Sequence, residues 1–219
     1  MKFELKSSSF FTLIWYGSLV YFIYLLLLIT LQYIPINYDV AFLRLKFEEV
    51  RFTHYRIAFF SHVFSSIVVI VAGLPQFSSL LRKKILGLHR FLGKIYIALI
   101  LLIASPSGLV LAYYANGGII SQISFAILSI LWFIFTLSAF RYIKKGEIEQ
   151  HRNFMIRSYA LTLSAISLRL FKFGIVSVFE LGPMDTYRIV AILAWTVNLL
   201  IAEIYIRRKR LLPHGGLRT

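Results

Sequence analysis

Residues 57–81 read IAFFSHVFSSIVVIVAGLPQFSSLL and contain no Asp, Glu, Lys or Arg. About 20 consecutive apolar residues are enough to cross the hydrocarbon core of a bilayer as an α-helix. This run is longer than that, and its polar side chains are scattered among branched and aromatic ones. It therefore predicts a transmembrane helix that carries His62 and Gln76 inside it.

Other parts of the chain have the same character. The further apolar stretches are residues 10–31, 92–114, 119–140, 154–179 and 187–206. The whole chain is 59% hydrophobic and 15% charged, whereas soluble domains carry about 25% charged residues. The sequence predicts an all-α, polytopic transmembrane bundle of about six helices that forms one integral membrane domain over residues 1–219. Pro106 falls inside the third helix and is expected to kink it, with neighbours satisfying the freed carbonyl.

The charges predict the orientation of this bundle. The net charge is +15, and the cations gather at the ends of the apolar stretches. One side would hold Lys2, Lys6, Arg82, Lys83, Lys84, Arg90, Lys94, Arg141, Lys144, Lys145, Arg152, Arg157, Arg207, Arg208, Lys209, Arg210 and Arg218. The other would hold Arg44, Lys46, Arg51, Arg56 and Arg188. Because cytoplasmic loops are enriched in Lys and Arg, both termini are expected in the cytoplasm. The expected partner is anionic lipid, at about 1 kcal/mol per cation near the surface, and not nucleic acid.

Several kinds of chemistry have no support in the sequence. There is no Cys, which excludes disulfides, thiolate metal sites and cysteine nucleophiles. A Gly-rich phosphate loop, HExxH and GxSxG are also missing. The longest outer connection, residues 32–56, mixes charged and aromatic residues and is expected to hold a short interfacial helix.

His89 and His151 are the main candidates for cofactor binding. One opens the third helix and the other the fifth, so the expected topology places both at the same depth near the cytoplasmic boundary. Two imidazoles from separate helices at equal depth could ligate one b-type haem axially. Gly93 would let a flat macrocycle approach, and the propionates would have cationic partners in Arg90, Arg152 or Arg157. The alternative is that both are interfacial histidines beside lipid headgroups.

A second set of polar residues lies deeper in the expected membrane. His62 would sit roughly 7 to 8 Å below the outer end of its helix, on a face shared with Gln76. On the fifth helix, His151, Ser158, Thr162 and Arg169 fall in a narrow sector, with Lys172 at its margin. Polar groups inside a bilayer are costly unless they are paired or hydrated. His62 could serve a haem or proton relay, or simply bond a neighbouring helix. Arg169 and Lys172 could line a polar path or snorkel toward Glu180 or Asp185. Glu203 is expected to pair locally with Arg207.

Four segments together resemble a known family. They are HVFSSIVVIVAGLPQF from His62, LRKKILGLHRFLGKIY from Leu81, GGIISQISFAILSILW from Gly117 and HRNFMIRSYALTLSAISLRL from His151. The sequence resembles the bacterial predicted membrane proteins of domain of unknown function 2306. The resemblance implies a multi-pass protein of the bacterial cell membrane and names no substrate. Its polar positions match His62, Gln76, Arg82, His89, His151, Arg157 and Arg169.

Three functions therefore compete at the level of sequence. The first is a membrane redox protein with one b-type haem on His89 and His151, exchanging electrons with a quinone near Arg157 and Tyr159. The second is a transporter or proton-coupled channel that uses His62, Arg169 and Lys172. The third is a structural or assembly partner of another membrane complex. His62 has no evident intramembrane histidine partner, so a second haem is not expected.

Overall fold

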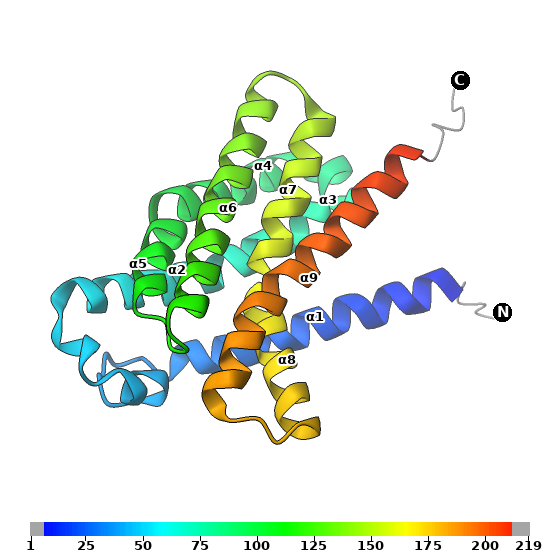
Figure 1. The fold of residues 1–219 in the computed structure, drawn as a ribbon. Coiled ribbons are helices and arrows are strands. Elements are labelled where there is room, and N and C mark those ends of the chain that lie inside the picture. The colour runs from blue at the N-terminus through cyan, green and yellow to red at the C-terminus, as the bar shows by residue number, and fades with distance from the viewer. Residues whose placement is uncertain (1–6, 212–219) are drawn as a thin grey trace, which may run out of the picture. The chain divides into compact units, whose positions relative to one another are not determined.

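The computed structural model of the chain is helical (Figure 1). It describes the backbone of residues 7–211, and their side chains except those of residues 7–13, 15, 79, 80 and 211. The α-helices are α1 (Ser7–Leu31), α2 (Thr53–Gly73), α3 (Ser79–Lys84), α4 (Leu86–Leu99), α5 (Ser105–Tyr113), α6 (Ile119–Lys144), α7 (Ile148–Thr162), α8 (Ser164–Val178) and α9 (Pro183–Leu211). Short 3-10 helices are η1 (Ala41–Lys46), η2 (Glu49–Arg51) and η3 (Leu74–Phe77), and η4 (Ile100–Ala104) is a π-helical turn. Residues 7–211 contain no strand, so the all-α prediction is confirmed.

The chain divides into two compact units, Met1–Phe47 and Glu48–Thr219. In the first, α1 contains 25 residues, and Ser18 and Thr30 donate their hydroxyl hydrogens to carbonyls four residues earlier, at 2.8 and 2.9 Å. Such bonds satisfy a hydroxyl within its own helix. Lys2, Lys6 and, in the tail of the second unit, Arg218 lie outside the described residues.

The interfacial segment expected after α1 is made of 3-10 turns. In the first unit, the Phe42 amide donates to the Tyr33 hydroxyl at 3.3 Å, and Arg44 Nε donates to the Asp39 carbonyl at 3.0 Å. These bonds hold η1, and η2 follows at the start of the second unit. The predicted helix is therefore present as two short 3-10 helices.

The second unit contains the candidate membrane spans. Among its described residues, four helical segments are long and apolar enough to cross, at Thr53–Phe77, Leu86–Tyr113, Ile119–Lys144 and Pro183–Arg210. The pair α7 and α8 qualifies together but is bent by 41° at its junction. In the first unit, the fully described part of α1, Tyr16–Leu31, is also apolar. Four or five candidate spans thus agree with a polytopic helical bundle, with helix ends that differ by a few residues from those predicted.

The expected distortion at Pro106 takes a specific form. The third predicted helix is built from α4, the π turn η4 and α5, and Pro106 lies in the first turn of α5. Proline has no amide hydrogen and cannot continue the helical bonding pattern. The Ala104 carbonyl at this junction accepts hydrogen bonds from His62 Nδ1 at 2.8 Å and from the Ser107 hydroxyl at 3.2 Å. His62 on α2 therefore bonds the backbone beside the distortion.

Tight turns and polar contacts join the remaining spans. Gly117 and Gly118 have positive φ angles of 84° and 73°, a conformation that glycine adopts without strain, and they turn the chain from α5 into α6. Between α6 and α9, the Ser124 hydroxyl donates to the Ala191 carbonyl at 2.8 Å and accepts from Trp195 Nε1 at 2.9 Å. These bonds fix the two helices together within the membrane.

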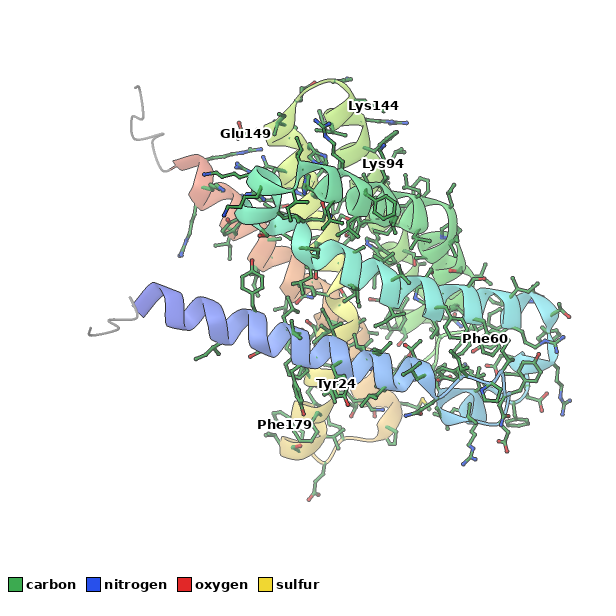
Figure 2. The ribbon with its side chains drawn as sticks, turned by 180° about the vertical axis from the view of Figure 1, so that it is seen from behind. Tyr24, Phe60, Lys94, Lys144, Glu149 and Phe179 are labelled. Carbon is green, nitrogen blue, oxygen red and sulfur yellow. The ribbon has the colours of Figure 1, made fainter. Side chains whose placement is uncertain are left out.

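A buried core lies where α2, α4, η4, α6 and α7 meet. Its residues are Val69, Ala72, Tyr96, Ile100, Ala104, Trp132, Ala139, Met155, Tyr159 and Leu161. Outside it, the spans expose large apolar side chains, as lipid-facing helices do. Within the second unit, Figure 2 shows Lys94, Lys144 and Glu149 toward one end and Phe179 toward the other. The bilayer is therefore the environment of this protein.

Candidate functional site

Five buried polar side chains join α4, α6 and α7 in the core. The Tyr96 hydroxyl lies 2.8 Å from Ser158 Oγ and 2.9 Å from Thr162 Oγ1. Trp132 Nε1 donates to Thr162 Oγ1 at 3.0 Å, and Thr136 Oγ1 lies 2.7 Å from Ser158 Oγ. All five side chains are at most 7% exposed. We call this set the hydroxyl network.

The hydrogens of the hydroxyl network can all be assigned. Thr162 donates to the Ser158 carbonyl at 3.0 Å, and Thr136 donates to the Trp132 carbonyl at 2.7 Å. Ser158 can then donate to Thr136, which leaves the single hydroxyl hydrogen of Tyr96 for Ser158 or Thr162. Every hydrogen has an acceptor, and because Tyr96, Trp132 and Thr136 all contact side chains on α7, the network holds α4 and α6 in register with α7.

This register brings His89 and His151 toward each other. His89 precedes Tyr96 by seven residues on α4, and His151 precedes Ser158 by seven residues on α7. Seven residues make almost two turns, so each histidine lies on the same face as its partner, about 10 Å nearer the helix start. Since Tyr96 bonds Ser158, we infer that the two histidine-bearing faces lie toward each other. Accordingly, His89 interacts electrostatically with His151.

The two imidazole rings differ in their bonding. His151 Nδ1 lies 2.8 Å from the Ala139 carbonyl on α6, so this nitrogen carries hydrogen, and in a neutral ring Nε2 is the nitrogen with the lone pair. His89 Nδ1 is buried and has no hydrogen-bond partner among the described residues. A fixed ring with an open Nε2 and a buried nitrogen without a partner are both suited to a ligand that lies between the helices.

Arg157 forms an ion pair with Glu203 in the structure. Its Nε and Nη2 donate to the two carboxylate oxygens of Glu203 at 2.5 and 3.0 Å, and its guanidinium lies 4.9 Å from the centre of the Phe154 ring. The prediction that Glu203 pairs locally with Arg207 therefore needs correction, because its bonded partner comes from another helix. An arginine held in this way is a weaker candidate for a propionate than Arg90, which is exposed and acts electrostatically on His89.

The space beside Gly93 is also occupied. A Cβ placed on Gly93 would lie 3.3 Å from Gln76 Oε1. Gln76 is buried and donates to the Ala72 carbonyl at 3.3 Å. The role predicted for Gly93, contact with a flat cofactor, is thus replaced at this point by close packing of η3 against α4.

His62 serves a packing function in the structure. Its bond to the Ala104 carbonyl supports the reading of a histidine that bonds a neighbouring helix. Gly108 makes room for the ring, since a Cβ there would lie 3.0 Å from His62 Cε1 and 2.9 Å from Ser129 Oγ. This histidine ties α2 to the start of α5.

The predicted polar stripe on the fifth helix is interrupted. Ser158 and Thr162 belong to the hydroxyl network, whereas Arg169 lies beyond the bend and is exposed on α8. Arg169 donates to the Ala165 carbonyl at 2.7 Å, back toward the bend and away from Glu180, and Asp185 pairs with Arg188 at 3.0 Å. Lys172 is exposed on the same helix.

The residues proposed for a polar path do not converge. His62, Gln76 and Arg169 each bond a different backbone carbonyl. Among the described residues, no group of three or more His, Asp or Glu side chains is arranged to hold a metal ion. A haem would need only two donors from the protein, because its porphyrin supplies the other four nitrogens, so a pair of histidines would be enough.

Sequence reasoning missed the hydroxyl network and the role of Asn198. Asn198 Nδ2 donates to the Ala160 carbonyl at 3.1 Å and its Oδ1 accepts from Ser167 at 2.8 Å, so α9 supports α7 and α8 on both sides of the bend. The spacing of seven residues from His89 to Tyr96 and from His151 to Ser158 was a usable signal for the network. No comparable local signal marks Asn198.

Comparison with known families agrees with the architecture. A family model described as predicted membrane protein (DUF2306) matches residues 59–206. No curated protein and no solved structure matches the chain. The matched range contains α4, α7, both central histidines and the hydroxyl network, and it covers well over half of the 219 residues. The chain therefore belongs to the DUF2306 family of multi-pass membrane proteins.

Proposed function

We propose that this protein is a membrane redox protein that holds one b-type haem between His89 and His151. The observation that carries the proposal is the Tyr96–Ser158 bond, from which we infer that the two histidine-bearing faces lie toward each other two turns away. A b-type haem held by two histidines would take one imidazole nitrogen from each of them. Parallel helices that present one imidazole each at equal depth suit that requirement.

The surroundings of the two rings support ligation. Metal-bound histidines commonly donate their second ring nitrogen to a carbonyl, which fixes the ring and raises its basicity. His151 has that bond, to Ala139. Arg90 would pair with a propionate, while Arg157 is held by Glu203. When bound, the haem would supply reversible one-electron chemistry, and the residues around it would orient it and exclude water.

The proposal extends to the setting of the reaction. A quinone dissolved in the same bilayer is the proposed electron partner, because the site lies among apolar spans. The bacterial plasma membrane is the proposed location, with the basic ends of the spans on anionic cytoplasmic lipid. Tyr159 and Arg157 bond Ile70 and Glu203 in the structure, so the quinone is proposed as a class, without a binding residue.

The test is the visible spectrum of the protein purified from cells supplied with haem, oxidised and then reduced with dithionite. We expect a Soret band and reducible α and β bands in the parent, lost in the His89→Ala, His151→Ala double variant. The His62→Ala variant should keep the bands, since His62 bonds only Ala104 in the described contacts. A colourless, well-folded parent would overturn the proposal.

The broken span favours a second candidate. Discontinuous helices near the middle of the membrane are typical of secondary transporters, and the α7–α8 junction is bent by 41° between polar residues. In that case flux into liposomes would depend on Arg169, and Arg169→Gln would abolish it without changing any spectrum. Co-purification of a fixed membrane partner, with neither cofactor nor flux, would favour the assembly function.

A further inference from the structure

Arg152 differs in its bonding from Arg157, which is also partly buried, and from Arg188, which is exposed. Its Nε is buried and has no hydrogen-bond partner among the described residues. By contrast, Arg157 Nε donates to Glu203 at 2.5 Å and Arg188 Nε donates to the Gly117 carbonyl at 2.8 Å. Leaving a buried charged donor unpaired is costly. The Nε of Arg152 therefore has a hydrogen to donate for which no described residue supplies an acceptor.

The position of Arg152 follows from Tyr159, seven residues later on the same face of α7. Tyr159 packs on Phe77 with ring centres 5.1 Å apart, and its hydroxyl donates to the Ile70 carbonyl at 3.3 Å. That face of α7 thus looks toward the end of α2 and η3. Arg152 lies about 10 Å nearer the start of α7, and we infer from this that it lies near the level where η3 leads into α3.

The neighbourhood is basic. Arg82 on α3 donates to the Gln76 carbonyl at 3.2 Å, which fixes it beside η3. Arg82 and Arg90 both act electrostatically on His89. The sequence has no Asp or Glu from residue 57 to residue 146, so the chain supplies no carboxylate from α2, α3, α4, α5 or α6 to neutralise them.

We propose that Arg152, together with Arg82 and Arg90, forms a binding site for phosphate oxygens at the end of the bundle where α3 and α4 begin. Phosphate offers three strong acceptor oxygens that match guanidinium donors. The source is either the headgroup of an anionic lipid or free phosphate. The site shares Arg90 with the proposed haem site but extends to another face of α7, because Arg152 projects about 100° around that helix from His151. It does not need a bound haem.

The experiment uses the full chain, expressed without added haem so that no propionate can occupy the site, in nanodiscs that contain phosphatidylcholine with or without phosphatidylglycerol. Retention of phosphatidylglycerol is measured by native mass spectrometry after release into detergent. The parent is compared with Arg152→Gln, with Arg152→Lys, which keeps the charge but lacks Nε, and with Lys145→Gln. Lys145 is exposed in the turn before α7 and makes a matched control for loss of one charge.

We expect both Arg152 variants to lower retention by about tenfold or more, as for loss of a charge-assisted hydrogen bond, and Lys145→Gln to leave it unchanged. A second arm measures thermal unfolding in phosphatidylcholine nanodiscs with inorganic phosphate added. Stabilisation there that depends on Arg152, without lipid retention, would identify free phosphate as the source. Equal behaviour of the parent, the Arg152 variants and Lys145→Gln in both arms would overturn the site.

Discussion

Gly73 allows two tyrosine rings to close over the end of α2. A Cβ at this position would lie 2.5 Å from Cε2 of Tyr159 and 2.8 Å from Cε2 of Tyr96. Both rings are held by hydrogen bonds from their hydroxyls, so neither can move aside without breaking a buried contact. Gly73 has ordinary helical dihedral angles, and the demand for glycine is therefore steric.

We expect Gly73→Ala to destabilise the protein by about 1–3 kcal/mol, the usual cost of overpacking a core. Thermal unfolding in one detergent would measure the change. Gly87→Ala is the control, because nothing lies within 4 Å of a Cβ placed there. If the two variants unfold at the same temperature, the tyrosine rings are not held as described.

The hydroxyl of Tyr96 can be tested in the same way. Tyr96→Phe removes one hydrogen bond donor from a fully buried network and leaves Ser158 and Thr162 with one neighbour fewer. Polar bonds between membrane helices contribute about 0.6 kcal/mol on average and up to about 1.7 kcal/mol. We expect a loss within that range for Tyr96→Phe and none for Tyr113→Phe, whose ring is 72% exposed. Equal melting temperatures would show that the network contributes no stability.

At the scale of elements, α7 and α9 are joined by the Arg157–Glu203 ion pair. The two side chains are 16% and 30% exposed, so water screens the pair only partly. Hydrogen bonds to charged groups contribute about 1.5–3 kcal/mol. We expect a coupling energy in that range from a double-mutant cycle built on Arg157→Gln and Glu203→Gln, measured by unfolding in detergent.

The control cycle uses Arg188 and Asp185, which pair at i,i+3 on α9 and are 46% and 62% exposed. Such exposed pairs contribute about 1 kcal/mol or less. A coupling energy for Arg157 and Glu203 no larger than that of the control pair would contradict a role in joining the helices.

The elements also show what the sequence could and could not predict. Apolar length predicted where the spans lie, and Pro106 predicted the distortion of the third one, because both depend on local chemistry. The bend between Thr162 and Ser164 has no Pro or Gly to announce it. Asn198, more than thirty residues away in sequence, hydrogen-bonds the helices beside the bend. In the same way, the ion-pair partner of Arg157 is Glu203 on another helix. Such tertiary partners cannot be read from spacing along one helix.

For the candidate site, the sequence allowed a prediction of depth but none of the side-chain surroundings. The charge pattern and the rise of a helix were enough to expect His89 and His151 at one level. The helix faces that meet are set by Tyr96 and Ser158, whose bond depends on how α4 and α7 are rotated. The roles expected for Gly93 and Arg157 gave way to Gln76 and Glu203 for the same reason, since side-chain neighbours from other helices fill the space first.

At the scale of the whole molecule, the distribution of cations predicts which ends of the spans face the cytoplasm. Lys145 lies in the exposed turn before α7, and Glu180 lies in the exposed loop after α8. Each of these helices has 15 residues, so together they extend about 45 Å, enough to cross the membrane. A bend of 41° leaves them running onward, whereas a re-entrant loop would have to reverse direction. We therefore predict that α7 and α8 cross as one broken span and place Lys145 in the cytoplasm and Glu180 outside.

Because the chain has no Cys, a single introduced thiol reports its own position. A membrane-impermeant maleimide added to intact spheroplasts should label the Glu180→Cys variant. It should label the Lys145→Cys variant only after the spheroplasts are permeabilised. Labelling of both thiols from the outside, or of neither, would put both ends of the pair on one side and make it a re-entrant loop. The reverse pattern, with Lys145→Cys labelled in intact cells, would keep the broken span but invert the bundle. His89 and His151 would then lie at the outer surface, so this result also decides on which side an electron donor to the proposed haem must be sought.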